Sequence, residues 1–262
     1  MTTRYVSRQK AALLLKGRRS GASWAQIVIM IAEFAVIGMQ VLSLYTLNAP
    51  LAGICISGAL DLLFVSPLKA GRAYYYKEIA LASSNVRFSD FLIFFRHHYE
   101  RAVLWRLRLW VTRTVWNAVF SLPSAVLLTV CLQAEQQGQA TVAVIAFVLA
   151  IVLFIFALIL TEIRMFRYIP VVYCLTELSV RQAFKIGRLY SKKFGGQWTL
   201  LYLDYAIPAL AFWLVVPFIF TTPVFHTARA ATVLRLFRKN PDEIPEQHLK
   251  RRKNHGKIVG EF

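Results

Sequence analysis

The chain has 262 residues, of which 57% are apolar and 17% are charged, with a net charge of +18. A soluble globular domain carries roughly 25% charged residues, and the apolar residues here form long blocks, so the composition excludes an ordinary soluble protein. A strongly basic chain can bind nucleic acid. Because lysine and arginine also collect on the cytoplasmic loops of membrane proteins, we attribute the charge to membrane topology and expect no nucleic-acid partner.

Two membrane spans are predicted near the N-terminus. Residues 1–23 are basic, and 8–16 is expected to form a short amphipathic helix at the membrane surface. The apolar block that follows is interrupted at residues 48–50 by an Asn-Ala-Pro sequence typical of a turn. Since one span needs about 20 residues, the block predicts spans at 24–46 and 51–67. The second is short, and it either crosses the bilayer or is re-entrant.

The middle of the chain alternates between mixed and apolar segments. Aromatic and charged residues interleave over 68–111, which predicts two or more amphipathic helices lying in the membrane interface. Two further spans are predicted at 112–133 and 140–163, with a polar turn between them. Pro170 follows the fourth span and should end or kink its helix.

The C-terminal part begins with a basic segment, 178–194, which we predict to be an amphipathic helix. Its apolar residues recur with the spacing of one helical face: Ile186, Leu189, Tyr190 and Phe194. The last apolar block is twice as long as one span and contains two prolines. We divide it into spans at 197–215 and 217–236, the alternative being one span and a re-entrant segment. The polar, basic tail over 238–262 is expected to be disordered.

The distribution of basic residues supports this division. All 31 lysines and arginines fall within the four segments that the six spans place on one side of the membrane: 1–23, 68–113, 162–195 and 228–262. Basic residues resist translocation, so both termini are expected in the cytoplasm. The predicted fold is an all-α, polytopic membrane bundle of about six transmembrane helices with amphipathic interfacial helices.

A stripe of polar residues lies on the first predicted span. Gln26, Glu33 and Gln40 are spaced by seven residues, nearly two helical turns, so they share one face of the helix. That face should point into the bundle rather than toward lipid. One hypothesis is a polar or proton-linked pathway centred on Glu33. The other, which we favour, is a set of hydrogen bonds between helices that fixes their packing.

Three further charged residues fall within predicted spans. Asp61, Asp204 and Arg229 each lie about 10 Å from the cytoplasmic boundary, judged from the rise of a helix. Asp204 and Arg229 belong to neighbouring spans and could form a pair. The residues either line a charged cavity that binds an ionic ligand or form structural ion pairs, with Asp61 hydrated or paired with Arg113.

Basic residues near the predicted inner boundary are expected to contact anionic lipid headgroups. These are Arg106, Arg108, Arg113, Lys192 and Lys193. The bilayer is therefore the expected partner, and another membrane protein is a possible one. The sequence contains no phosphate-binding loop, no nucleophile elbow and no zinc-ligand spacing. We expect no catalytic residue, no metal site and no cofactor.

Several short motifs follow one another in a recognisable order: Arg8–Gly17 before Trp24, Ser66–Gly71, Phe88–Phe95, Ala183–Ser191 before Gly195-Gly196, and then Trp213 and Pro223. Together they resemble a family of uncharacterised bacterial integral membrane proteins called domain of unknown function 975. The resemblance implies six helices and a bacterial plasma membrane, and it implies no activity.

Three functions are compatible with these features. The leading hypothesis is a non-catalytic protein that scaffolds partners or organises anionic lipid, because the predicted surface helices and tail are basic. The alternative is a transporter for a small or amphiphilic solute that uses the charged residues within the spans, Glu33, Asp61, Asp204 and Arg229. A lipid-modifying enzyme is a weaker alternative. A water-filled cavity at Glu33 would favour transport, whereas paired charges in a solid core would favour the scaffold.

Overall fold

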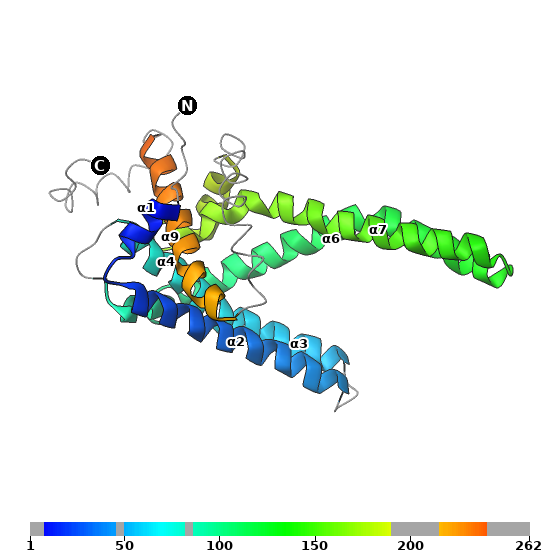
Figure 1. Cartoon of the computed structure of the whole chain (residues 1–262), viewed down its shortest axis with the longest axis horizontal. Coiled ribbons are helices and arrows are strands. Elements are labelled where there is room, and N and C mark those ends of the chain that lie inside the picture. The colour runs from blue at the N-terminus through cyan, green and yellow to red at the C-terminus, as the bar shows by residue number, and fades with distance from the viewer. Residues whose placement is uncertain (1–7, 46–49, 82–85, 190–214, 240–262) are drawn as a thin grey trace.

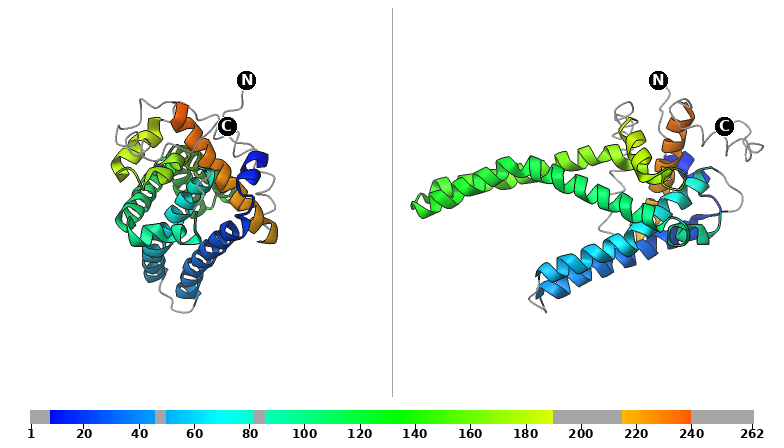
Figure 2. Two further views of the ribbon diagram at one scale, coloured as in Figure 1. Left: turned by 90° about the vertical axis from the view of Figure 1, so that its left-hand side faces the viewer. Right: turned by 180° about the vertical axis from the view of Figure 1, so that it is seen from behind.

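The computed structural model describes residues 8–45, 50–81, 86–189 and 215–239. Regular structure in these ranges is helical, without a strand. Figure 1 shows two long helical hairpins that leave a common head and extend in the same general direction, one of them reaching well past the tip of the other. The view from behind in Figure 2 shows the same arrangement.

The first hairpin pairs α2 (Arg19–Tyr45) with α3 (Pro50–Leu60). Its outer surface consists of large apolar side chains, many of them more than half exposed, as a bilayer solvent favours. Its inner surface uses small residues, since Gly53 lies directly against the Ser43 side chain. The two helices therefore approach closely, as small residues allow in membrane proteins.

The helix of α3 continues into the head through a π-helical turn, η1 (Asp61–Val65), and then α4 (Ser66–Ala80). Pro67 explains the change of hydrogen-bonding pattern, because proline has no N–H to donate to the carbonyl of Leu63. The Ser66 N–H reaches back to the Asp61 carbonyl instead. The Tyr99 hydroxyl, 3.0 Å away, donates to the Leu63 carbonyl.

The second hairpin pairs α6 (Tyr99–Gln136) with α7 (Ala140–Met165), and Gly138 turns the chain between them with a φ of 72°. Small residues on α7 recur every three to seven positions and are buried against α6: Ala143, Ala146, Ala150, Ala157 and Thr161. The Ser124 hydroxyl donates to the Ala150 carbonyl at 2.8 Å. The remaining faces of α7 are apolar and exposed, which suits contact with lipid.

The head is built around α4, most of whose residues are buried. The other elements of the head are α1 (Arg8–Leu14), η2 (Phe88–Leu92), α5 (Ile93–Arg96), η3 (Phe166–Cys174), the helix at 180–189 and α9 (Val215–Lys239). Tyr76 is fully buried, donates to the Ala22 carbonyl at 3.1 Å and stacks on His226. Gly71 lets the backbone of Phe91 approach α4 so closely that a side chain at 71 would collide with it.

Four helices are long and apolar enough to cross a membrane: Arg19–Tyr45, Pro50–Ala80, Tyr99–Gln136 and Ala140–Cys174. Each of them overlaps one of the first four predicted spans, and the second and third extend well beyond the predicted bounds. The predicted span at 197–215 lies outside the described residues. The segment 217–236 is helical within α9, but α9 is not among these four helices, and it packs against α1, α2 and α4. The total of six spans stays a prediction.

The prediction of interfacial helices over 68–111 is wrong for 68–80, which form the buried centre of the head. Residues 99–111 are not a separate helix either, because α6 is continuous through them into the membrane hairpin. Most aromatic residues of 68–80 are covered by protein, whereas Tyr99, Arg108 and Trp110 of α6 are exposed. Periodicity alone does not distinguish these two environments.

The basic helix predicted over 178–194 is present at 180–189, and residues beyond it lie outside the described ranges. Its buried face consists of Ala183, Phe184, Ile186 and Gly187, whereas Leu189 is half exposed. The predicted apolar face is thus wrong in part. Ile186 is buried as predicted, but Leu189 is not, and Phe184, which was not on the predicted face, packs against Tyr168 of η3. Pro170 lies in the 3-10 helix η3 that follows the end of α7, as expected. Most of the predicted disordered tail lies outside the described residues.

Candidate functional site

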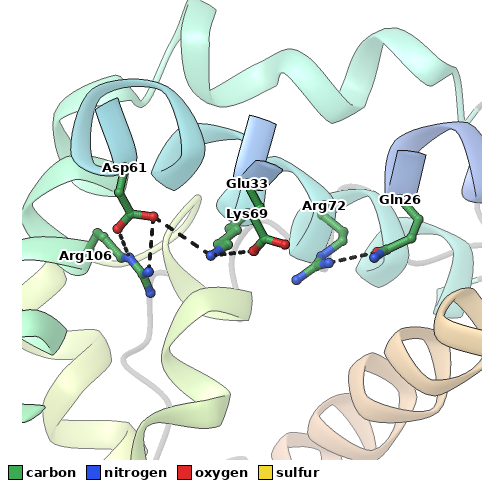
Figure 3. A network of polar contacts seen from close by, with 6 residues as sticks. All are labelled: Gln26, Glu33, Asp61, Lys69, Arg72 and Arg106. Atoms are coloured by element: carbon green, nitrogen blue, oxygen red, sulfur yellow. Dashed lines mark hydrogen bonds and ion pairs between the residues drawn. The ribbon is translucent and has the colours of Figure 1, made fainter. Parts of the chain in front are cut away.

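A network of polar side chains lies where the first hairpin joins the head. Figure 3 shows its members, which we call the root network: Gln26, Glu33, Asp61, Lys69, Arg72 and Arg106. They come from α2, η1, α4 and α6, so four separate helical segments meet through polar contacts here. Of its charged members, Glu33 and Asp61 lie on the predicted spans, whereas Lys69, Arg72 and Arg106 belong to the segment 68–111 that was predicted to be interfacial.

Lys69 is the centre of the network. Its Nζ lies 2.7 Å from Oε1 of Glu33 and 3.9 Å from Oδ1 of Asp61. The ammonium group thus bridges two carboxylates that are distant in sequence and belong to different helices. Because Glu33 of α2 contacts Lys69 of α4, the polar face of the first span points at a neighbouring helix, as predicted.

Asp61 has a second and stronger partner in Arg106. The guanidinium is bidentate, with Nε 2.8 Å from Oδ2 and Nη2 3.2 Å from Oδ1. The side chain of Asp61 is 17% exposed and that of Arg106 is 22% exposed, so solvent screens the pair only weakly. Arg106 therefore has a protein partner in place of the expected lipid headgroup.

The other two members of the polar stripe also bond across the hairpin or into the head. Nη1 of Arg72 donates to Oε1 of Gln26 at 2.8 Å, and Nε2 of Gln40 donates to the Ser57 hydroxyl at 2.9 Å. The whole stripe is thus occupied by contacts between helices. Polar contacts between helices are what the packing hypothesis, based on the seven-residue spacing, predicts.

The remaining predicted residues lie elsewhere. Arg113 pairs with Glu162 at 2.6 Å, not with Asp61, because both lie at the same level of the α6–α7 hairpin. The guanidinium of Arg108 stacks 4.5 Å from the ring centre of Phe184, and that of Arg229 lies 5.8 Å from the ring centre of Phe225. Both are cation–π contacts with protein. Asp204, Lys192 and Lys193 lie outside the described residues.

Sequence reasoning missed Lys69 and Arg72, which were assigned to an interfacial segment. A signal for them exists in the sequence. Residues of an antiparallel hairpin that are equally far from its turn face each other. Measured from Asn48, Gln40 is about as far from the turn as Ser57, and Gln26 about as far as Arg72. Extending the second predicted helix past 67 would have matched these partners.

Root-network residues line neither of two cavities that the described residues form. One, of about 230 Å³, lies between α1, α2 and α9 and is lined by Leu15, Arg19, Ser23 and Pro223 among others. The second, of about 400 Å³, is an open hollow along 96–101. Within the ranges that the structure describes, no three histidine, cysteine or acidic side chains gather as metal ligands would.

No family model, no curated protein and no solved structure matches this chain. The interpretation of the site therefore rests on its geometry. Membership of the family named above stays a prediction.

Proposed function

We propose that the protein is a non-catalytic scaffold of the bacterial plasma membrane, which gathers anionic lipid beneath its head. One observation carries the proposal: charged side chains of the membrane hairpins form ion pairs between helices. Glu33 pairs with Lys69, Asp61 with Arg106, and Glu162 with Arg113. These pairs join segments of the protein, which is what a rigid membrane-anchored framework requires.

A transporter is less well supported by the same pairs. A carrier needs charged or polar groups that face a hydrated cavity and are exchanged between partners during transport. Glu33 and Asp61 instead share Lys69, and Asp61 also receives a bidentate guanidinium. The cavity between α1, α2 and α9 and the hollow along 96–101 are both lined by other residues.

The surface of the head supports an attraction to anionic lipid. On the helix at 180–189, Arg181, Lys185 and Arg188 are exposed and follow the three- to four-residue spacing of one face, while Phe184 and Ile186 on the other face are buried. Each basic residue near an anionic leaflet contributes about 1 kcal/mol of attraction. With both termini and the head in the cytoplasm, this face would meet the anionic inner leaflet.

The lipid that accompanies the protein tests the proposal. Extracted in native-lipid discs, the wild-type protein is expected to carry a severalfold enrichment of anionic phospholipid over the bulk membrane, measured by mass spectrometry. Neutralising the basic face with Arg181→Gln, Lys185→Gln and Arg188→Gln should remove much of this enrichment, because about 1 kcal/mol per residue is lost. The control variant Arg181→Lys with Arg188→Lys keeps the charge and should retain the enrichment. Bulk-like lipid around the wild-type protein would refute the proposal.

The transporter hypothesis makes a different prediction. In vesicles loaded with a pH-sensitive dye, an imposed proton gradient should decay at the same rate with and without the protein. A faster decay that Glu33→Gln abolishes would replace the scaffold by a proton-linked carrier.

A further inference from the structure

We infer that the two hairpins enter the membrane to different depths: α6–α7 crosses the bilayer, whereas α2–α3 is a wedge confined to the acyl chains of the cytoplasmic leaflet. The inference deepens the proposed scaffold and rests on its orientation, with the head in the cytoplasm. For the first hairpin, the inference concerns the two helices at 19–45 and 50–60.

The charge-free part of the first hairpin, beyond Glu33 and Asp61, is short, although α2 as a whole is long and apolar enough to cross a membrane. Between Glu33 and the end of α2 at Tyr45 the helix is about 18 Å long, and between Pro50 and Asp61 it is about 17 Å long. The hydrocarbon core of a bilayer is about 30 Å thick. The charge-free length thus matches one leaflet, not two.

The second hairpin is long enough to cross. From Arg113 to the end of α6 at Gln136 the helix is about 34 Å long, and from Ala140 to Glu162 it is about 33 Å long. These segments contain a single charged residue, Glu135, beside the turn. The Arg113–Glu162 pair therefore marks the cytoplasmic boundary of a complete span.

The ion pair between Asp61 and Arg106 fixes the relative depth of the two hairpins. Arg106 lies two helical turns before Arg113, so it stands about 10 Å on the cytoplasmic side of that boundary. Asp61 contacts Arg106 directly and must lie at the same level. From there the first hairpin extends only about 17 Å, which takes its tip into the cytoplasmic leaflet and no further.

The opposite assumption leads to a contradiction. If the tip of α2–α3 reached the outer boundary, α6–α7 would project beyond that boundary by more than 25 Å, since from the shared level it extends about 45 Å. Exposed apolar residues of α7, among them Val144 and Ile145, would then stand in water. Figure 1 shows this difference in reach directly.

Acyl chains are the occupant that fits the surface of the wedge. Leu51 and Tyr45 are each 78% exposed, and Val41 is 50% exposed. No protein element in the described ranges covers these side chains. Counting basic residues does not reveal the difference in depth, because a hairpin of two full spans and a half-inserted hairpin both return the chain to the cytoplasm. Material inserted into one leaflet alone expands that leaflet, so a scaffold of this shape would favour curved membrane.

Cysteine labelling measures the depth of both hairpins. In a background with Cys55→Ala, Cys131→Ala and Cys174→Ala, single cysteines are placed at the tip of the first hairpin (Leu51→Cys), in the turn of the second (Gln137→Cys) and on exposed α1 (Leu13→Cys). A membrane-impermeant maleimide is added to intact cells and to inside-out vesicles. We expect Gln137→Cys to react only from outside, Leu13→Cys only from the cytoplasmic side, and Leu51→Cys from neither until detergent is added.

Departures from this pattern at Leu51→Cys and at Leu13→Cys have different meanings. Labelling of Leu51→Cys from outside would show a full span, and labelling from the cytoplasmic side would show a hairpin that does not enter the bilayer; either overturns the wedge. Labelling of Leu13→Cys from outside would instead overturn the orientation on which the proposed scaffold depends. Elution of all three variants with the wild-type profile establishes that they are folded.

Discussion

Replacing Asp61 by alanine is expected to lower the free energy of unfolding by about 3 kcal/mol, because it leaves the Arg106 guanidinium without its carboxylate in a mostly buried site. The same substitution removes one of the two carboxylates beside Lys69. Reversible unfolding in detergent micelles, followed by the loss of helical circular dichroism, measures the change.

Two further variants identify the cause of that loss. Glu162→Ala breaks the ion pair with Arg113. The side chain of Glu162 is 55% exposed and that of Arg113 is 43% exposed, so the loss of unfolding free energy should be less than about 1 kcal/mol. In the double variant Asp61→Ala with Arg106→Ala neither charge is left alone, so the combined loss should be smaller than the sum of the two single losses. Additive losses would show that the pair contributes no coupling energy.

Replacing Gly71 by alanine is expected to destabilise the protein by about 3 kcal/mol, at the upper end of the range for overpacked cores. An added Cβ would lie 1.9 Å from the carbonyl oxygen of Phe91, and both α4 and the Phe91 backbone are buried. Because the obstacle is backbone rather than a flexible side chain, η2 must move away from α4. The measurement is again reversible unfolding in micelles.

Gly38 provides the matched control. It lies in the middle of α2, where an added Cβ would meet no atom within 4 Å. In a helix interior alanine is favoured over glycine by about 1 kcal/mol, so Gly38→Ala should leave stability unchanged or raise it slightly. Equal effects of the two substitutions would mean that α4 and η2 do not approach each other as described.

The polar stripe illustrates how far sequence reasoning reaches. The seven-residue spacing of Gln26, Glu33 and Gln40 requires a common face, and each of the three has a partner across that face. The partners Lys69 and Arg72 were not predicted, because a basic, aromatic segment buried by protein has the same composition as one lying on a membrane. Only packing distinguishes the two cases.

The sequence by itself determined the membrane character, the two turns that create the hairpins and the polar face of the first helix. Each of these follows from local properties: apolar length, turn-forming residues and helical period. The tertiary structure alone decided that Asp61 pairs with Arg106 while Arg113 pairs with Glu162. That choice underlies the inferred difference in depth between the hairpins. It depends on how segments far apart in the chain are brought together, which no local pattern specifies.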